Sequence, residues 1–425
     1  MSDELAPQPR TVTLPADRGP RSRRSGEPAK RSPKQPEAER ATSLGVLRCV
    51  LVVSATMGEG HNATGQALTE AVGRLWPAAR VEWLDTLDVM GPGIGPLFRS
   101  IYSSNVEHAP WLYELFYDSL CHRPWFAHGS KRFVGAWAGR RMYPLIRARR
   151  PDVILSTYPL GTAALAWLRR HRGLRTPVGA WVSDFAPHPF WVYTEVDLNL
   201  VMHEIARPLA ERQVPGAPVD VTAPTVRAAF APQDQAVARE AAGLPPHEFV
   251  ALLSCGSLAF GDEGAAARAL LEAAPEVQVI AVCGRNDHLR SALASEFAGE
   301  DRIRVLGWVD DMPTLQNACD VLVTNGGGAT ALEALACGRA VLMYRPIAGH
   351  GLANAELMER AGLAVVCRDQ AQLTAAIRRF HAEPQTLAEM QQNALQQAHR
   401  RSVEDGLTRL LEVAHQGAVT VPGGA

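Results

Sequence analysis

The sequence lacks any apolar run close to the ~20 residues that a membrane-spanning helix needs, and its first residues lack the apolar centre of a signal peptide. We therefore expect a chain that is neither embedded in a bilayer nor exported. The chain also lacks an excess of charge of either sign, because its formal net charge is -1 over 425 residues. This balance gives no general case for binding nucleic acid, and we expect no nucleic-acid partner.

Paired cysteines are missing as well. The seven cysteines are scattered, none is spaced C-x-x-C, and several lie in apolar strand-like segments. Buried, reduced thiols in a cytosolic protein are the natural interpretation. No aspartate cluster demands a metal ion. With 47% hydrophobic and 20% charged residues, the chain can form the large cores of two or three domains.

Short apolar segments alternate with amphipathic ones along most of the chain. After residues 1–43, which are rich in Pro, Arg, Ser and Glu and which we predict to be a disordered tail, the alternation predicts parallel, doubly wound sheets. We predict an α/β domain at 44–230 and a second at 231–400, with a helix end and tail at 401–425. Residues after about 385 are expected to form one helical stretch. The expected strands are 46–55, 81–84, 152–156, 178–183, 198–202, 249–254, 278–283, 303–306, 321–324, 341–344 and 364–366.

Two glycine-rich turns carry most of the functional signal. The first, Gly58-Glu59-Gly60-His61, follows an apolar strand, and the second, residues 324–330 with three consecutive glycines, follows another. Each predicts a strand, a tight turn and a helix start, a geometry that directs backbone N–H groups and the positive helix end at an anion. Two such turns suggest that one domain holds a phosphorylated donor and the other a second substrate.

The first turn also permits a rival interpretation. Gly58, Gly60 and Ala63 satisfy the dinucleotide-binding pattern G-x-G-x-x-G/A, and Asp85 lies roughly the expected ~20 residues further on. Alone, this pattern predicts an NAD enzyme. The second glycine cluster, which is followed by Glu333 on a helical segment, argues against that prediction.

Ordered motifs in both halves resemble the GT-B glycosyltransferases of the monogalactosyldiacylglycerol synthase type. This group includes the processive diacylglycerol glucosyltransferases and is related to the lipid II-forming transferase of peptidoglycan synthesis. The resemblance covers roughly residues 46–400. It rests on the segments 54–61, 151–154, 157–159, 183–185, 188–191, 283–286, 307–312, 327–333, 346–349 and 354–355.

The resemblance implies two Rossmann-like domains that face each other across a cleft, with a UDP-sugar donor in the C-terminal domain. It also implies inverting transfer of a hexosyl group to a lipid hydroxyl of the diacylglycerol type, without a metal or other cofactor. Relatives usually have Gln-Glu where this chain has His350-Gly351, and often Lys-Pro where it has Thr324-Asn325, which leaves the donor sugar open. The implied donor-binding residues are Gly256, Ser257, Arg285, Gly327, Gly328, Ala329, Thr330, Glu333, His350 and Asn354.

The acceptor hydroxyl needs a base. His61, on the first helical turn, is the first candidate, and Asp184, at the end of a predicted strand, is the second. His188 could orient either of them, while Gly58 and Gly60 belong to the acceptor side.

A basic and aromatic stretch predicts a membrane contact. Residues 119–150 contain eight Lys or Arg and no Asp or Glu, with aromatic residues interleaved. Such a pattern suits an interfacial helix on anionic lipid, although a buried aromatic face with solvated cations would look the same. The predicted membrane face comprises Trp125, Phe126, Arg140, Arg141, Arg147 and Arg149.

Together these features predict a cytoplasmic glycosyltransferase that associates peripherally with the inner face of the cell membrane. Three alternatives stay open: a transferase that acts on a soluble natural product, a sugar-nucleotide epimerase, and a non-catalytic regulator that binds a UDP-sugar.

Overall fold

The computed structural model describes residues 46–57, 60–256, 261–398 and 401–419. All of them belong to one compact unit, Glu37–Ala425. The tail predicted at residues 1–43 lies outside the described residues, as do Gly58 and Ser257.

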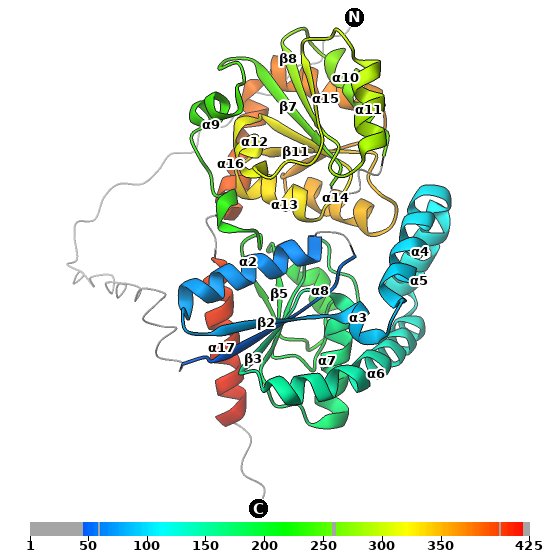
Figure 1. The fold of residues 1–425 in the computed structure, drawn as a ribbon, viewed down its shortest axis with the longest axis vertical. Coiled ribbons are helices and arrows are strands. Elements are labelled where there is room, and N and C mark those ends of the chain that lie inside the picture. Colours follow the sequence, from blue (N-terminus) through cyan, green and yellow to red (C-terminus); the bar gives the residue numbers. More distant parts are fainter. Residues whose placement is uncertain (1–45, 58–59, 257–260, 399–400, 420–425) are drawn as a thin grey trace, which may run out of the picture. The chain divides into compact units, whose positions relative to one another are not determined.

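The first half of the chain is built on a six-stranded parallel sheet in the order β2-β1-β3-β4-β5-β6 (Figure 1). Strands β1, β3, β4 and β5 are buried along their whole length, which explains why they are apolar without alternation. Five of the six strands were predicted, whereas the three-residue β6 is too short to stand out. The strands are β1 (Cys49–Ser54), β2 (Arg80–Asp85), β3 (Val153–Ser156), β4 (Val178–Trp181), β5 (Leu198–Val201) and β6 (Val219–Val221).

Seven helices accompany this sheet among the described residues. Three separate helices follow α3 in place of one long helix, because α5 and α6 each begin with a proline, which fits the first turn of a helix but not its interior. The helices are α2 (Gly60–Leu75), α3 (Thr86–Met90), α4 (Ile94–His108), α5 (Pro110–His122), α6 (Pro124–Arg149), α7 (Pro159–Arg172) and α8 (Arg207–Gln213).

The second half contains another six-stranded parallel sheet, in the order β12-β11-β10-β7-β8-β9. All six strands were predicted. Strand order reverses between β7 and β10, and ligands of open α/β sheets bind beyond the carboxyl ends of the strands at such a point. The strands are β7 (Phe249–Ser254), β8 (Val277–Val282), β9 (Ile303–Leu306), β10 (Val321–Thr324), β11 (Ala340–Tyr344) and β12 (Ala364–Cys367).

The linker and the second half contain one short 3-10 helix and eight α-helices within the described ranges. They are η1 (Ala228–Phe230), α9 (Gln235–Ala242), α10 (Glu263–Leu271), α11 (Asp287–Glu296), α12 (Met312–Ala318), α13 (Ala329–Ala336), α14 (His350–Arg360), α15 (Gln370–Ala382) and α16 (Pro384–Ala398).

The prediction of one helical stretch after residue 385 is wrong, because a separate helix, α17 (Val403–Val419), follows α16. Ser402 starts it with a capping box: its Oγ accepts from the N–H of Asp405, and its own N–H donates to the Asp405 carboxylate. α17 returns to the first sheet (Figure 1). There Leu410 packs on Gly179 of β4.

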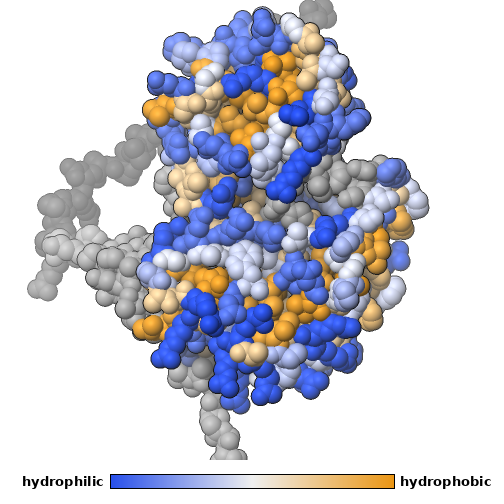
Figure 2. Space-filling model, viewed as in Figure 1, coloured by the Kyte–Doolittle hydropathy of each residue, from blue (hydrophilic) through white to orange (hydrophobic). Residues whose placement is uncertain are grey.

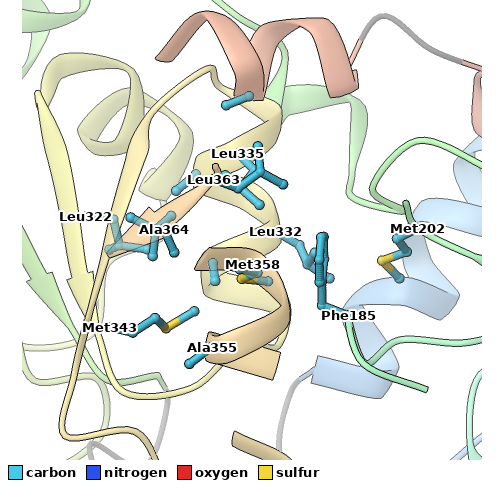
Figure 3. Close-up of a cluster of buried hydrophobic side chains, with 14 of the residues drawn as sticks. Phe185, Met202, Leu322, Leu332, Leu335, Met343, Ala355, Met358, Leu363 and Ala364 are labelled. Atoms are coloured by element: carbon cyan, nitrogen blue, oxygen red, sulfur yellow. The ribbon is translucent and has the colours of Figure 1, made fainter. Parts of the chain in front are cut away.

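The two halves share a buried core. Phe185 and Met202 come from the first half, yet they belong to the same hydrophobic cluster as Leu332 of α13 and Met358 of α14 (Figure 3). The loop that follows β4 is therefore held against the helices of the second half.

Candidate active site

A cavity of about 550 Å³ lies where the two halves meet. Its walls come from the ends of β7 and β10 and from the glycine turn before α13, while Met57, Gly60 and Tyr102 contribute from the first half. The cavity therefore occupies the reversal point of the second sheet, the place where this architecture positions ligands.

The glycine turn of residues 326–328 leads directly into α13. Gly328 is the N-cap, and no side chain caps the first amides of the helix. A Cβ at Gly328 would meet nothing within 4 Å, whereas a Cβ at Gly327 would lie 2.3 Å from the Cβ of Asn354. Gly328 thus leaves room for a ligand at a helix N-terminus, and Gly327 allows α14 to pack closely.

Glu333 lines the cavity one turn into α13. Burial raises the pKa of its carboxyl to about 7, although Arg227 opposes the shift. Arg227, in the linker beside η1, also lines the cavity and is a functional candidate that the sequence motifs did not indicate. It stands outside every glycine-rich or strand-end motif, so no local pattern marked it.

An aromatic and charged group forms another wall. The Arg285 guanidinium lies 4.3 Å from the ring centre of Trp308, and the indole N–H of Trp308 donates to Asp310 Oδ1 at 2.9 Å. All three residues line the cavity, including Arg285, which was predicted to bind the donor. The flat ring and its cation suit contacts with an aromatic or anionic part of a ligand.

His350, the first residue of α14, lines the cavity and connects it to the first half. Its Nδ1 lies 2.9 Å from Tyr113 Oη on α5, and its ring centre lies 6.3 Å from that of Tyr102 on α4. Burial, with a smaller contribution from Asp184, raises the pKa of Tyr102 to about 12. The hydroxyl of Tyr102 therefore stays protonated at neutral pH.

His61 lies beside this cavity, next to the cavity-lining Gly60. Its Nδ1 lies 2.9 Å from Ser183 Oγ, and its ring centre lies 4.9 Å from that of Tyr158. Burial lowers the pKa of His61, although the charge of Asp184 acts in the opposite direction. His61 is therefore neutral at pH 7 and able to accept a proton.

Asp184 is held by two donors. Trp191 Nε1 donates to its Oδ2 at 2.6 Å, and Asn354 Nδ2 donates to its Oδ1 at 3.3 Å. Burial alone would raise the pKa of this carboxyl, but His350, His188, the indole N–H and His61 together bring it below the usual range. Asp184 is ionised at neutral pH.

His188 stands next to Asp184 but makes no short bond to it. Its Nε2 lies 3.7 Å from Asp184 Oδ2, while its Nδ1 accepts from the N–H of Phe190. Burial lowers the pKa of His188 to about 4 against the attraction of Asp184, so the ring is neutral and Nε2 carries its proton. That proton faces the carboxylate.

The structure brings most of the proposed donor residues together around one cavity. Asn354 is an exception, since it is fully buried and bonded to Asp184 and Ala186. His61, Asp184 and His188 form a second cluster beside the cavity. The predicted residues among those lining the cavity are Gly60, Gly256, Arg285, Gly327, Gly328, Ala329, Thr330, Glu333 and His350.

The helices α4–α6 expose many large apolar side chains (Figure 2). Trp125, from the predicted membrane face, is 72% exposed, whereas Phe126 is partly buried against Phe116 and Trp125. Eight side chains, each more than 40% exposed, define what we call the α4–α6 apolar face: Leu97, Ile101, Trp111, Leu112, Leu115, Phe116, Trp125 and Phe133.

The four predicted membrane arginines differ in their surroundings. Arg149 pairs with Glu82 of β2 at 2.8 Å, which ties it to the sheet. The guanidinium of Arg140 lies 5.3 Å from the Trp167 ring centre, and Arg141 and Arg147 approach aromatic rings of α6 itself. Arg140, Arg141 and Arg147 remain exposed.

Within the described part of the chain, no group of three or more His, Cys, Asp or Glu side chains could hold a metal ion. Nor does any helix in the described ranges have the length and apolar character needed to cross a bilayer.

Comparisons with known proteins agree with this architecture. Residues 61–226 match the family model "Monogalactosyldiacylglycerol (MGDG) synthase", and residues 265–397 match "Glycosyl transferases group 1". The chain is 25% identical to a processive diacylglycerol beta-glucosyltransferase of Bacillus thuringiensis over 378 residues, which cover 86% of this chain and 94% of the relative.

Solved structures share the fold. The MurG of Acinetobacter baumannii superposes with a TM-score of 0.52 at 15% identity, over 86% of this chain and 99% of that one. The sucrose-phosphate synthase of Thermosynechococcus elongatus gives a TM-score of 0.56 at 16% identity, over 88% and 99%. The chain therefore has the GT-B fold of glycosyltransferases, as its motifs predicted, and its two halves match the monogalactosyldiacylglycerol synthase and glycosyl transferases group 1 models in that order.

Proposed function

We propose that the protein transfers a hexosyl group from a UDP-sugar to the hydroxyl of a diacylglycerol-type lipid, with inversion at the anomeric carbon. The observation that carries the proposal is the cavity itself, where an uncapped helix N-terminus, an open glycine and Glu333 line one wall. The names of the relatives support the acceptor and the β-product, because they are diacylglycerol beta-glucosyltransferases.

The donor would lie along the glycine turn. Backbone N–H groups at the start of α13 would bind the diphosphate and stabilise the charge that develops on the leaving UDP. Glu333, once ionised, would accept hydrogen bonds from the two ribose hydroxyls, since a carboxylate offers acceptors to both. Arg227 and Arg285 add positive charge to the same cavity.

His61 is the base that the geometry favours. Its lowered pKa keeps it neutral and ready to take the acceptor proton, whereas Asp184 is a weak base because its pKa is lowered. The negative charge of Asp184 would stabilise the imidazolium that forms on His61. Neither residue lines the donor cavity, so the acceptor hydroxyl would approach from the side of the first half.

The lipid would reach this site along α4 and α5. Ile101 belongs to the α4–α6 apolar face, while its neighbour Tyr102 lines the cavity, so one turn of helix borders both. An apolar face with nearby arginines suits the surface of an anionic bilayer, which supports a peripheral association with the membrane.

A panel of radiolabelled UDP-sugars, incubated with the protein and diacylglycerol vesicles, tests the proposal. Label in the organic phase is the expected result. A soluble glycoside would indicate an acceptor outside the membrane, and UDP binding without turnover would indicate a regulator. An altered sugar nucleotide would indicate an epimerase, whose candidacy rests on the fold of a UDP-N-acetylglucosamine 2-epimerase that matches with a TM-score of 0.54.

A further inference from the structure

Asn354 connects the two halves through both ends of its side-chain amide. It is fully buried on α14, its Oδ1 accepts from the N–H of Ala186 at 2.7 Å, and its Nδ2 donates to Asp184 Oδ1 at 3.3 Å. Both partners belong to the loop after β4. A buried amide with its two ends on one loop fixes that loop in position.

The same residue touches the donor side. Its Cβ would be 2.3 Å from a Cβ at Gly327, so α14 and the glycine turn are in direct contact there. A second link lies in the segment just before α14, where the N–H of Ile347 donates to the carbonyl oxygen of Asn325 at 3.0 Å. The glycine turn is therefore joined to α14 by close packing and to the segment before α14 by a backbone hydrogen bond.

Packing also holds the loop. Phe185, the residue after Asp184, is fully buried in the cluster that contains Leu332 of α13 and Met358 of α14 (Figure 3). Because this core is closely packed, a shift of the glycine turn would be transmitted to the loop.

We propose that Asn354 is a positioning residue that couples the donor-binding turn to Asp184. The proposal rests on the proposed function, in which Asp184 assists proton transfer. By donating to the carboxylate, Asn354 favours the ionised form and fixes its orientation, so that the charge faces the acceptor side while the turn holds the donor.

Several other groups also influence the pKa of the Asp184 carboxyl and would contribute to any measured titration. Trp191 donates to it, and three histidines and three tyrosines from α2, α4, α5, α14 and its own loop interact with its charge: His61, His188, His350, Tyr102, Tyr113 and Tyr117. All of these remain in a variant that changes Asn354 alone.

The test compares Asn354→Leu with Gln397→Met in the full chain. Gln397 is a matched control, because it is also a buried amide that bonds across the halves, to the carbonyl oxygen of Met202, away from Asp184. The pKa of Asp184 is measured by carbon-13 NMR of its carboxyl, assigned with Asp184→Asn. In Asn354→Leu it should rise by about one unit, the scale of a lost hydrogen bond to the charged form.

Kinetics supply the second readout. In Asn354→Leu, kcat should fall about tenfold or more, while KM for the donor should change less. The acid limb of the kcat–pH profile should shift to higher pH. Saturation with UDP should shift the Asp184 carboxyl resonance in the wild type and do so less in the variant. Gln397→Met should change neither the limb nor the resonance.

An Asp184 pKa that is the same in the wild type and in folded Asn354→Leu would overturn the proposal. If the leucine variant does not fold, Asn354→Asp keeps the shape and should raise the apparent pKa of the carboxyl pair. The NMR titration needs no turnover. Absence of transfer by the wild type would therefore refute the proposed function alone, and an unchanged Asp184 pKa with active transfer would refute the coupling alone.

Discussion

Gly60 and Ala329 are neighbours in the lining of the cavity: a Cβ on Gly60 would lie 3.9 Å from the Cβ of Ala329, at van der Waals contact. The first residue begins α2 and the second begins α13, so two helix N-termini from different halves converge. Each N-terminus carries partial positive charge and favours an anion. Their meeting point is where a diphosphate leaving group and an attacking hydroxyl would be brought together.

Alanine substitutions at Gly327 and Gly328, in the glycine turn before α13, should have different effects on stability and on UDP binding. Gly327→Ala should lower the free energy of unfolding by about 1–3 kcal/mol, because its Cβ would overlap Asn354. Gly328→Ala should cost less than about 1 kcal/mol, because its Cβ meets nothing within 4 Å. Its methyl group would occupy ligand space instead, and UDP affinity should fall about tenfold or more. Chemical denaturation and calorimetry measure the two effects, and equal stabilities would contradict the packing argument.

Donor binding should depend on pH through Glu333. With a pKa of about 7, its carboxyl is half protonated at neutrality, and only the ionised form accepts freely from both ribose hydroxyls. UDP affinity should therefore rise as the pH increases through 7. Glu333→Gln should weaken binding by about 1–3 kcal/mol at pH 8 and remove this part of the rise. Ionisation of UDP itself affects the wild type and Glu333→Gln equally. If UDP affinity depends on pH in the same way in both, Glu333 does not bind the ribose.

The variants His61→Ala and Asp184→Ala should affect the rate of sugar transfer but not the binding of UDP. Each should reduce turnover by about 10²–10⁴-fold, the range for loss of a general base or of its electrostatic partner. UDP affinity should change little, because neither side chain lines the donor cavity. Steady-state kinetics and calorimetry on the same samples provide the comparison. Near-normal turnover in both variants would exclude both residues from proton transfer.

The motifs predicted the parts of this site that are local in sequence. Buried parallel strands are continuous apolar runs, and a strand followed by glycines and a helix start is a local pattern, so eleven of the strands and the donor turn could be predicted. Arg227 and Tyr102 could not, because each reaches the cavity only through the tertiary fold. Asn354 was expected at the donor, yet it bonds to Asp184, which lies 170 positions earlier in the chain.

Membrane binding should depend on both apolar and basic residues, in different ways. Replacing Trp111, Phe116 and Trp125 with Ser should lower vesicle affinity at low and high salt, because these side chains are exposed and insertion is not screened. Replacing Arg140, Arg141 and Arg147 with Gln should lose up to about 1 kcal/mol per charge on anionic vesicles at low salt only. Co-sedimentation of both variants and the wild type measures this. Equal pelleting of all three would remove α4–α6 as the membrane face.

Turnover should persist in EDTA. In the proposed mechanism the helix N-terminus and the cavity arginines stabilise the leaving diphosphate, so no divalent ion is required. The measurement is the rate of sugar transfer before and after chelation, with magnesium and manganese added back. Loss of activity that either ion restores would show that the prediction of metal-independent transfer is wrong.

The most direct test of the account is the anomeric configuration of the product. UDP-α-hexoses are incubated with the protein and diacylglycerol vesicles, the organic phase is collected, and the new glycosidic bond is assigned by proton NMR. A single displacement by a hydroxyl that His61 activates predicts a β-linked glycolipid, and His61→Ala should form little of it. An α-linked product, or no sugar in the organic phase with any donor, would contradict the proposed reaction.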